Sequence, residues 1–290
     1  MTAVTGLALF TRTAHDSSAR IIGAYSTSFG LASRLLARDV RRRVADIYAL
    51  VRVADEIVDG PGVEAGLDRA QRRALLEEFE HESLAALERG FSANLVVHAF
   101  AVTARETGIG ADLIVPFFTS MRMDTDGIAI FDLDAYRRYV YGSAEVVGVM
   151  CLRAFVTEEP SIRIDHQLEE GARRLGAAFQ KVNFLRDLAD DIDRLGRVYL
   201  PGVDPAAFAD DDKDAVVEEI DLDLAVARSA IGRLPPRSRR ATAAAAGLFG
   251  RLNDELRKTP AAEIRRRRIS LSRATKLRVL AGAVWERAAE

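Results

Sequence analysis

Cysteine is almost absent from this chain, which has one, Cys151, among its 290 residues. A single cysteine cannot form an internal disulfide or a cysteine-rich metal site. Prolines are also few, at 8, which is compatible with many long helices. The N-terminus lacks an apolar segment preceded by positive charge, the pattern typical of secretion signals. We therefore expect a cytoplasmic protein.

Long apolar runs are missing as well, since none reaches the roughly 18 residues needed to span a bilayer. Even the stretch 140–155 contains Glu145 and Arg153, so we expect no integral membrane segment. The formal net charge of -2 gives no overall attraction to polyanions, and we expect no nucleic-acid partner. A composition of 49% hydrophobic and 29% charged residues excludes a disordered chain and indicates a soluble globular protein.

Apolar residues recur at intervals of three and four almost throughout the chain, whereas sustained alternation is hard to find. This pattern predicts an all-α protein. The Gly- and Pro-rich breaks between helices are too short for domain linkers. We expect an N-terminal extension over residues 1–14 and one all-α domain over 15–290. The predicted helices cover residues 15–38, 41–58, 64–89, 92–107, 110–123, 132–156, 164–193, 211–231, 236–258 and 273–288.

Two acidic clusters lie within these predicted helices, and each places two aspartates four residues apart. The first contains Asp55 and Asp59, and the second contains Asp187 and Asp191. A like-charged pair at this spacing costs about 0.2 to 0.5 kcal/mol, so two such pairs suggest a cation that offsets the repulsion. Magnesium is the first candidate, because this hard cation prefers carboxylate oxygens. The alternative for either pair taken alone is a solvated helix face.

Polar side chains extend both aspartate pairs along their helices. Tyr48 and Arg52 share the face of the first pair, whereas Gln180 and Asn183 share that of the second, with Arg186 beside them. Both helices are otherwise apolar, so we expect them to be buried with the polar stripe facing a cavity. The pattern predicts a metal-diphosphate site. Its expected metal ligands are Asp55, Asp59, Asn183, Asp187 and Asp191.

Five strings occur in an order that resembles the squalene/phytoene synthase family over residues 15–285, most like bacterial phytoene synthases. They are YSTSF (25–29), YALVRVADEIVD (48–59), YVYGSAEVVG (139–148), QKVNFLRDLADD (180–191) and GRVYLP (196–201). The resemblance implies a single-domain, isoprenoid-synthase-type helical bundle with a central cavity and both aspartate motifs at its mouth. It also implies Mg²⁺ dependence, with Mn²⁺ as an alternative.

The same resemblance implies roles for individual residues. The four aspartates and Tyr139 would be catalytic, although Tyr139 has an alternative reading as a buried tyrosine hydrogen-bonded to a neighbouring helix. Small residues such as Gly142 and Gly148 would leave room for a prenyl tail or allow close helix packing. The expected substrate-binding residues are Ser26, Ser28, Tyr48, Arg52, Gln180, Asn183, Arg186, Phe249 and Lys276.

The basic segment from Arg265 to Arg278 allows three readings. It can be a solvated helix start, it can close over the diphosphates through Lys276 and at least one arginine, or it can attract anionic lipid. The third reading predicts weak peripheral contact with a membrane, to which a long hydrocarbon product would be delivered.

The leading functional interpretation is a Mg-dependent prenyltransferase that joins two geranylgeranyl diphosphates to phytoene through a cyclopropyl diphosphate, without a nicotinamide. One alternative transfers a short prenyl group to an aromatic acceptor, in a cavity shortened by Phe249, Glu145 and the bulk around Met150. Another makes squalene or dehydrosqualene from farnesyl diphosphate. A noncatalytic scaffold is the remaining alternative, and its expected sign would be the loss of the aspartates.

Overall fold

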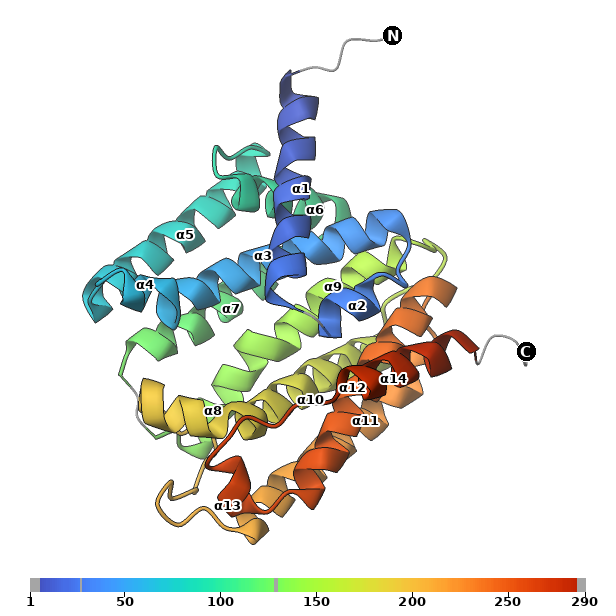
Figure 1. Cartoon of the computed structure of the whole chain (residues 1–290). Coiled ribbons are helices and arrows are strands. Elements are labelled where there is room, and N and C mark those ends of the chain that lie inside the picture. The colour runs from blue at the N-terminus through green and yellow to red at the C-terminus, as the bar shows by residue number, and fades with distance from the viewer. Residues whose placement is uncertain (1–5, 27, 128–129, 286–290) are drawn as a thin grey trace.

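The computed structural model describes residues 6–26, 28–127 and 130–285, and the described chain is an all-α bundle, which confirms the predicted fold class (Figure 1). Its α-helices are α1 (Gly6–Tyr25), α2 (Ser28–Ser33), α3 (Arg38–Val58), α4 (Pro61–Glu64), α5 (Arg69–Arg89), α6 (Leu95–Thr107), α7 (Ala111–Thr125), α8 (Leu133–Val140), α9 (Val146–Val156), α10 (His166–Asp190), α11 (Asp210–Ile231), α12 (Pro236–Lys258), α13 (Ala261–Ile264) and α14 (Arg273–Trp285). Two π-helical turns, η1 (Tyr141–Glu145) and η2 (Asp191–Leu195), interrupt this series.

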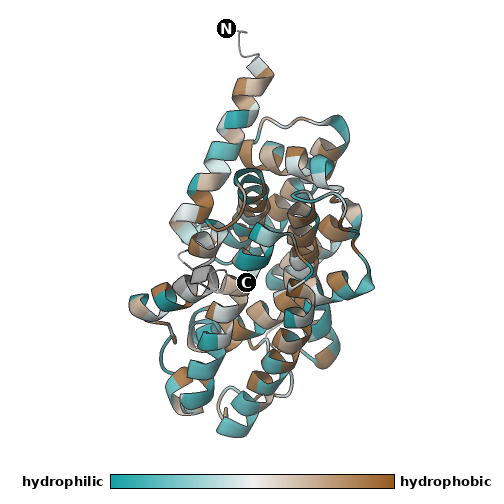
Figure 2. Cartoon of the chain, turned by 90° about the vertical axis from the view of Figure 1, so that its right-hand side faces the viewer, coloured by the Kyte–Doolittle hydropathy of each residue, from teal (hydrophilic) through white to brown (hydrophobic). Residues whose placement is uncertain are grey.

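One continuous apolar core extends through the bundle, from Leu36 before α3 to Ile269 after α13. Helix α10 packs against α9 on one side and α11 on the other, while α3 contacts α7 and α9. Figure 2 shows apolar residues gathered on the central helices and hydrophilic residues on the outer helix faces. This arrangement places the two acidic motifs, one on α3 and one on α10, within the same bundle.

The helix predicted over residues 15–38 is wrong at both ends. Helix α1 begins earlier, at Gly6, and ends at Tyr25, after which the separate helix α2 begins at Ser28. Ser26 and Ser28 flank the break, and serine hydroxyls compete for backbone hydrogen bonds in a way that favours helix ends. Residues 6–14 therefore belong to a helix that packs on α3 and α6, while the domain boundary at residue 15 stays a prediction.

Two predicted helices contain π-helical turns that the sequence pattern did not indicate. The helix predicted over 132–156 is interrupted by η1, and the helix predicted over 164–193 changes to η2 at Asp191. Such turns occur often at functional sites. Here η2 begins at the last aspartate of the second acidic motif.

The small residues around η1 serve helix packing. A Cβ on Gly142 would overlap the backbone oxygen of Pro116 in α7, and a Cβ on Gly148 would overlap that of Ala172 in α10. Close helix packing is therefore the reason for both glycines, and of the two only Gly148 also lines the central cavity.

One described segment, Leu133–Val156, is long and apolar enough to cross a membrane by length and composition alone. Half of it is buried inside the bundle. It consists of α8, η1 and α9, which pack against α7 and α10, so its apolar character is explained by its place in the core.

Candidate active site

A cavity of about 790 Å³ lies between α3, α9, α10 and α12, and both predicted polar stripes line it. Tyr48, Arg52 and Asp55 come from α3. Gln180, Asn183 and Arg186 come from α10. The remaining wall is largely apolar and includes Phe117, Val147, Leu152, Phe155, Leu168, Leu175, Phe179, Leu234, Leu248 and Phe249. The cavity therefore combines a charged wall with space suited to an apolar chain.

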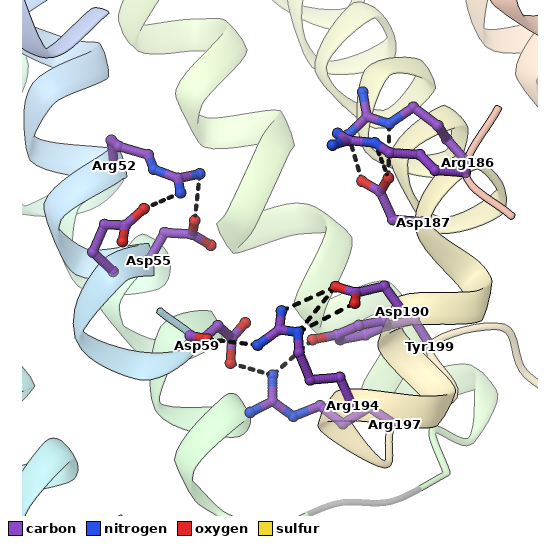
Figure 3. Close-up of polar contacts among 11 residues, drawn as sticks. Arg52, Asp55, Asp59, Arg186, Asp187, Asp190, Arg194, Arg197 and Tyr199 are labelled. Atoms are coloured by element: carbon purple, nitrogen blue, oxygen red, sulfur yellow. Dashed lines mark hydrogen bonds and ion pairs between the residues drawn. The ribbon is translucent and has the colours of Figure 1, made fainter. Parts of the chain in front are cut away.

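In the first motif, Asp55 pairs with an arginine of its own helix. Arg52 Nη1 lies 2.9 Å from Asp55 Oδ2, and Arg52 also forms an ion pair with Glu56 (Figure 3). The guanidinium stacks over Tyr25, 4.5 Å from the ring centroid. Although 42% of the Asp55 side chain is exposed, it lines the cavity. Burial, reinforced by the charge of Asp59 and opposed by Arg52, raises the pKa of Asp55 to about 6.

The other aspartate of this motif, Asp59, is held by arginines that follow the second motif. Arg197 Nη1 lies 2.6 Å from Asp59 Oδ1. Arg194 Nη1 donates to the backbone oxygen of Asp59 at 3.1 Å, while its Nη2 lies 3.0 Å from Asp190 Oδ2. Arg194 therefore connects the two motifs directly, as Figure 3 shows.

In the second motif, Asp187 is paired and Asp191 is not. Arg186 Nε donates to Asp187 Oδ1 at 2.9 Å, and Arg268 Nε approaches the same oxygen at 2.8 Å. Within the described residues Asp191 forms no ion pair. Burial, together with the charges of Asp187, Asp59 and Asp190, raises its pKa to about 7. The second motif thus retains repulsion that a bound cation would relieve.

The donor chemistry fits a hard divalent cation, although no three carboxylate, imidazole or thiol groups of the described chain converge in a ready-made metal cage. Asn183 Oδ1 is buried without a hydrogen-bond partner in the part of the chain described, and Asn183 lines the cavity. An unpaired buried oxygen is costly, and a water molecule or a bound cation would satisfy it. Magnesium commonly uses one or two protein carboxylates and completes its shell with water and phosphate oxygens, so a closed protein cage is not required.

Tyr139 matches the alternative reading, a buried tyrosine hydrogen-bonded to a neighbouring helix, and it also lines the cavity, while its catalytic role stays a prediction. The hydroxyl donates to Asp124 Oδ2 on α7 at 2.8 Å. Burial and the adjacent Asp124 charge raise the pKa of Tyr139 well above its usual value. The phenol therefore stays protonated at neutral pH.

Ser26, Phe249 and Lys276 also line the cavity, as expected for substrate-binding residues. Phe249 stacks on Phe179 with ring centroids 3.8 Å apart. The Ser28 side chain lies outside the described residues. Asp59, Asp187 and Asp191 lie beyond the cavity wall itself, so the functional roles of the predicted site residues stay predictions.

The basic segment before α14 reaches the second motif. Besides the Arg268 contact with Asp187, Arg265 Nη2 lies 2.6 Å from Asp193 Oδ1. Arg268 and Lys276 both line the cavity. These contacts support the reading in which this segment closes over the diphosphate site.

Several polar residues of the site were missed by sequence reasoning. Asp124, Arg194, Arg197 and Tyr199 form a network with Asp59, and Glu56 binds Arg52. The string GRVYLP contains Arg197 and Tyr199, so the sequence could have indicated these two residues as members of the site. No sequence pattern indicated Asp124, because it contacts Arg197 across 73 residues of sequence.

The amino-acid sequence is similar to a known protein family and to several of its members. The squalene/phytoene synthase family model matches residues 22–275. A 15-cis-phytoene synthase from Paracoccus sp. is 30% identical over 283 residues, covering 93% of this chain and 90% of that protein. Phytoene synthase 1 from Arabidopsis thaliana is 29% identical over 69% of this chain, and the match spans 46% of the plant protein.

Solved structures share the fold. A dehydrosqualene synthase superposes with a TM-score of 0.79 at 22% identity, covering 97% of this chain and 98% of the other. A squalene synthase from Alicyclobacillus acidocaldarius gives a TM-score of 0.73 at 19% identity, covering 86% of this chain and 95% of the other.

Proposed function

Because the chain belongs to the squalene/phytoene synthase family, we propose that it joins two geranylgeranyl diphosphates head to head to form phytoene through a cyclopropyl diphosphate. Its family makes it a prenyltransferase of isoprenoid biosynthesis. Members process prenyl diphosphates and are generally dependent on divalent metals. The observation that carries the proposal is the apolar cavity of about 790 Å³, whose charged wall includes Asp55 of the first motif and the two arginines that pair with Asp187 of the second.

The charged wall fits the ionisation step. Breaking the allylic carbon–oxygen bond places negative charge on the departing pyrophosphate, and preorganised cations stabilise such charge. Arg52, Arg186 and Lys276 line the cavity and would bind the diphosphate oxygens. Mg²⁺, or Mn²⁺ in its place, would be held by the four motif aspartates with Asn183, and would supply further electrostatic stabilisation of the leaving group.

The apolar wall fits the carbon chemistry. Leu152, Phe155 and Leu168 extend the lining away from the acidic motifs, where they would hold the prenyl chains and exclude water from the allylic cation. Tyr139, which keeps its proton and donates a hydrogen bond to Asp124, would present its ring to the reacting carbons without acting as a base. The released pyrophosphate is then the available acceptor for the proton lost in forming the product.

The cavity gives less support to a short donor with an aromatic acceptor. Of the three features that would shorten it, Phe249 lines the wall and so do Cys151 and Leu152, which follow Met150, while Glu145 does not contribute to the described lining. A scaffold role is disfavoured because all four aspartates are present, and Asp55, Asp59 and Asp187 pair with arginines. A squalene or dehydrosqualene synthase would use the same site with farnesyl diphosphate.

We further propose a cytoplasmic enzyme that contacts anionic membranes weakly through α14. Leu277 is 61% exposed there, and the neighbouring Arg273 and Arg278 side chains are exposed as well. Each basic residue near an anionic surface contributes about 1 kcal/mol. Cosedimentation with anionic vesicles at low and high salt tests this proposal, and absence of binding at low salt would reject it.

The reaction is tested by incubating the purified protein and Mg²⁺ with dimethylallyl, geranyl, farnesyl or geranylgeranyl diphosphate. Lipid products and released pyrophosphate are measured for each donor. We expect a dimeric hydrocarbon from geranylgeranyl diphosphate. A dimeric hydrocarbon from farnesyl diphosphate alone would replace phytoene by the shorter product, and none from any donor would reject head-to-head condensation.

A further inference from the structure

A buried polar network outside the cavity wall connects the first acidic motif with the cavity tyrosine. Its centre is Asp124, at the C-terminal end of α7, whose side chain is 1% exposed. Asp124 Oδ2 accepts a hydrogen bond from the Tyr139 hydroxyl at 2.8 Å, and Oδ1 accepts one from the Tyr199 hydroxyl at 2.8 Å. The rings of Tyr139 and Tyr199 also contact each other, with centroids 4.9 Å apart. The direction of the Tyr139 hydroxyl is therefore set by Asp124.

Arg197 extends this network to Asp59. Its Nη1 lies 3.1 Å from Asp124 Oδ1 and 2.6 Å from Asp59 Oδ1, while Nη2 donates to the backbone oxygen of Asp124 at 2.7 Å. The Arg197 side chain is only 10% exposed, so its charge depends on both carboxylates for compensation. A planar guanidinium bound at several points fixes orientation in a way that a point charge does not.

These contacts occupy one oxygen of Asp59. Oδ1 is bound by Arg197, whereas Oδ2 has no hydrogen bond or ion pair with any described residue. A carboxylate held through one oxygen presents the other in a fixed direction. Partners that orient a metal ligand in this manner contribute substantially to affinity, and their loss typically costs 10- to 100-fold.

We propose that Arg197 and Asp124 are positioning residues that orient Asp59 for metal binding, and that Asp124 orients Tyr139 at the same time. The inference rests on the proposed function, because it takes Asp59 as a metal ligand. Asp124 has a second effect, since it accepts hydrogen bonds from the Arg197 guanidinium through Oδ1 and through its backbone oxygen. Without this carboxylate, the guanidinium would pair with Asp59 alone and compete with the cation.

The test is a titration of the full chain with Mg²⁺ in the presence of inorganic pyrophosphate, followed by calorimetry and by the shift in melting temperature. Arg197→Lys keeps the charge and loses the multipoint geometry, whereas Asp124→Asn keeps the size and loses the charge. Both should bind Mg²⁺ about 10- to 100-fold more weakly than the wild type. Added Mg²⁺ should restore turnover of Arg197→Lys, a rescue that a purely structural defect would not show.

Asp46→Asn is the matched control. Asp46 on α3 is, like Asp124 on α7, a fully buried aspartate, but it binds Thr103 Oγ1 at 2.7 Å and His15 Nδ1 at 2.9 Å, outside the cavity. This variant should keep wild-type Mg²⁺ affinity whatever its stability.

The possible results distinguish failure of the proposed function from failure of the positioning role of Arg197 and Asp124. If the wild type itself gives no Mg²⁺-dependent response with pyrophosphate, the proposed function fails. If the wild type responds and the folded Arg197→Lys and Asp124→Asn proteins bind Mg²⁺ equally well, the positioning role is overturned while the function stands. Should Asp124→Asn fail to fold, Arg197→Lys decides alone.

Discussion

The two acidic motifs have the same spacing but are held in different ways. Asp59 of the first motif is fixed by Arg197, whose own side chain is 10% exposed and anchored on a second buried carboxylate. Asp187 of the second motif is paired with Arg268, whose side chain is 66% exposed. Asp191 forms no ion pair among the residues described and begins a π-helical turn.

The two motifs therefore differ in how firmly their aspartates are held before a ligand binds. Within the first motif, Asp59 is held in a buried network and is oriented before any ligand arrives, whereas Asp55 is 42% exposed. Asp187 of the second motif is held by the half-buried Arg186 and the exposed Arg268, which both line the cavity and which a diphosphate can attract away from the carboxylate.

Arg197→Ala should destabilise the fold by about 3 to 5 kcal/mol, because it leaves Asp124 buried without its compensating charge. Arg268→Ala should cost less than about 1 kcal/mol, because the ion pair that it removes is largely exposed. Urea unfolding of both variants measures the two values side by side. Equal losses of stability would contradict the contrast between the buried ion pairs of Arg197 and the exposed ion pair of Arg268.

Asp187→Ala should lower turnover with geranylgeranyl diphosphate by at least about a hundredfold, the effect of losing a preorganised electrostatic group. Glu169→Gln is the control, since Glu169 lies on the same helix but pairs with Arg173 at 2.8 Å near the start of α10. We expect near-normal turnover for the control. Near-normal turnover for Asp187→Ala would refute its assignment.

Gly148→Ala should destabilise the protein by about 1 to 3 kcal/mol, because the added methyl group overlaps the Ala172 backbone oxygen and pushes α9 away from α10. This displacement would also shift Asp187, because α10 carries the second motif. Gly23→Ala in α1 meets no atom within 4 Å and should gain about 0.5 to 1 kcal/mol instead. Thermal unfolding measures the stability of both variants. If Gly148→Ala left the stability unchanged, the packing of α9 on α10 would be able to relax around the added methyl group.

The smallest effect concerns pH. Folding raises the pKa of Asp55 to about 6 and that of Asp191 to about 7, so the folded state favours their protonated forms. Their contribution to stability is complete below the unfolded pKa of about 4 and is lost as pH rises through about 6 and about 7, respectively. In metal-free protein, Asp191→Asn should therefore change the pH dependence of unfolding at higher pH than Asp55→Asn does. Coincident difference curves would contradict the additional repulsion that Asp187, Asp59 and Asp190 exert on Asp191.

The sequence predicted the parts of the site that depend on local periodicity. Tyr48, Arg52 and Asp55 recur at helical spacing on an otherwise apolar helix, and they line the cavity together. Asp124 and Arg197 could not be found in this way, because Arg197 meets Asp59 across 138 residues and the contact depends on packing of α7 beside α3. The break at Ser26 and the two π-helical turns were missed because apolar periodicity continues across them.

The central claim is that both motifs form a single site for ionising a prenyl diphosphate. It is tested most directly by the release of pyrophosphate from geranylgeranyl diphosphate by Asp55→Ala, Asp187→Ala and the double variant. Residues that act as one unit give strongly non-additive losses. The account predicts that each single variant is nearly inactive and that the double variant is little worse than either. Losses that multiply in the double variant would mean that the two motifs act independently and would contradict the account.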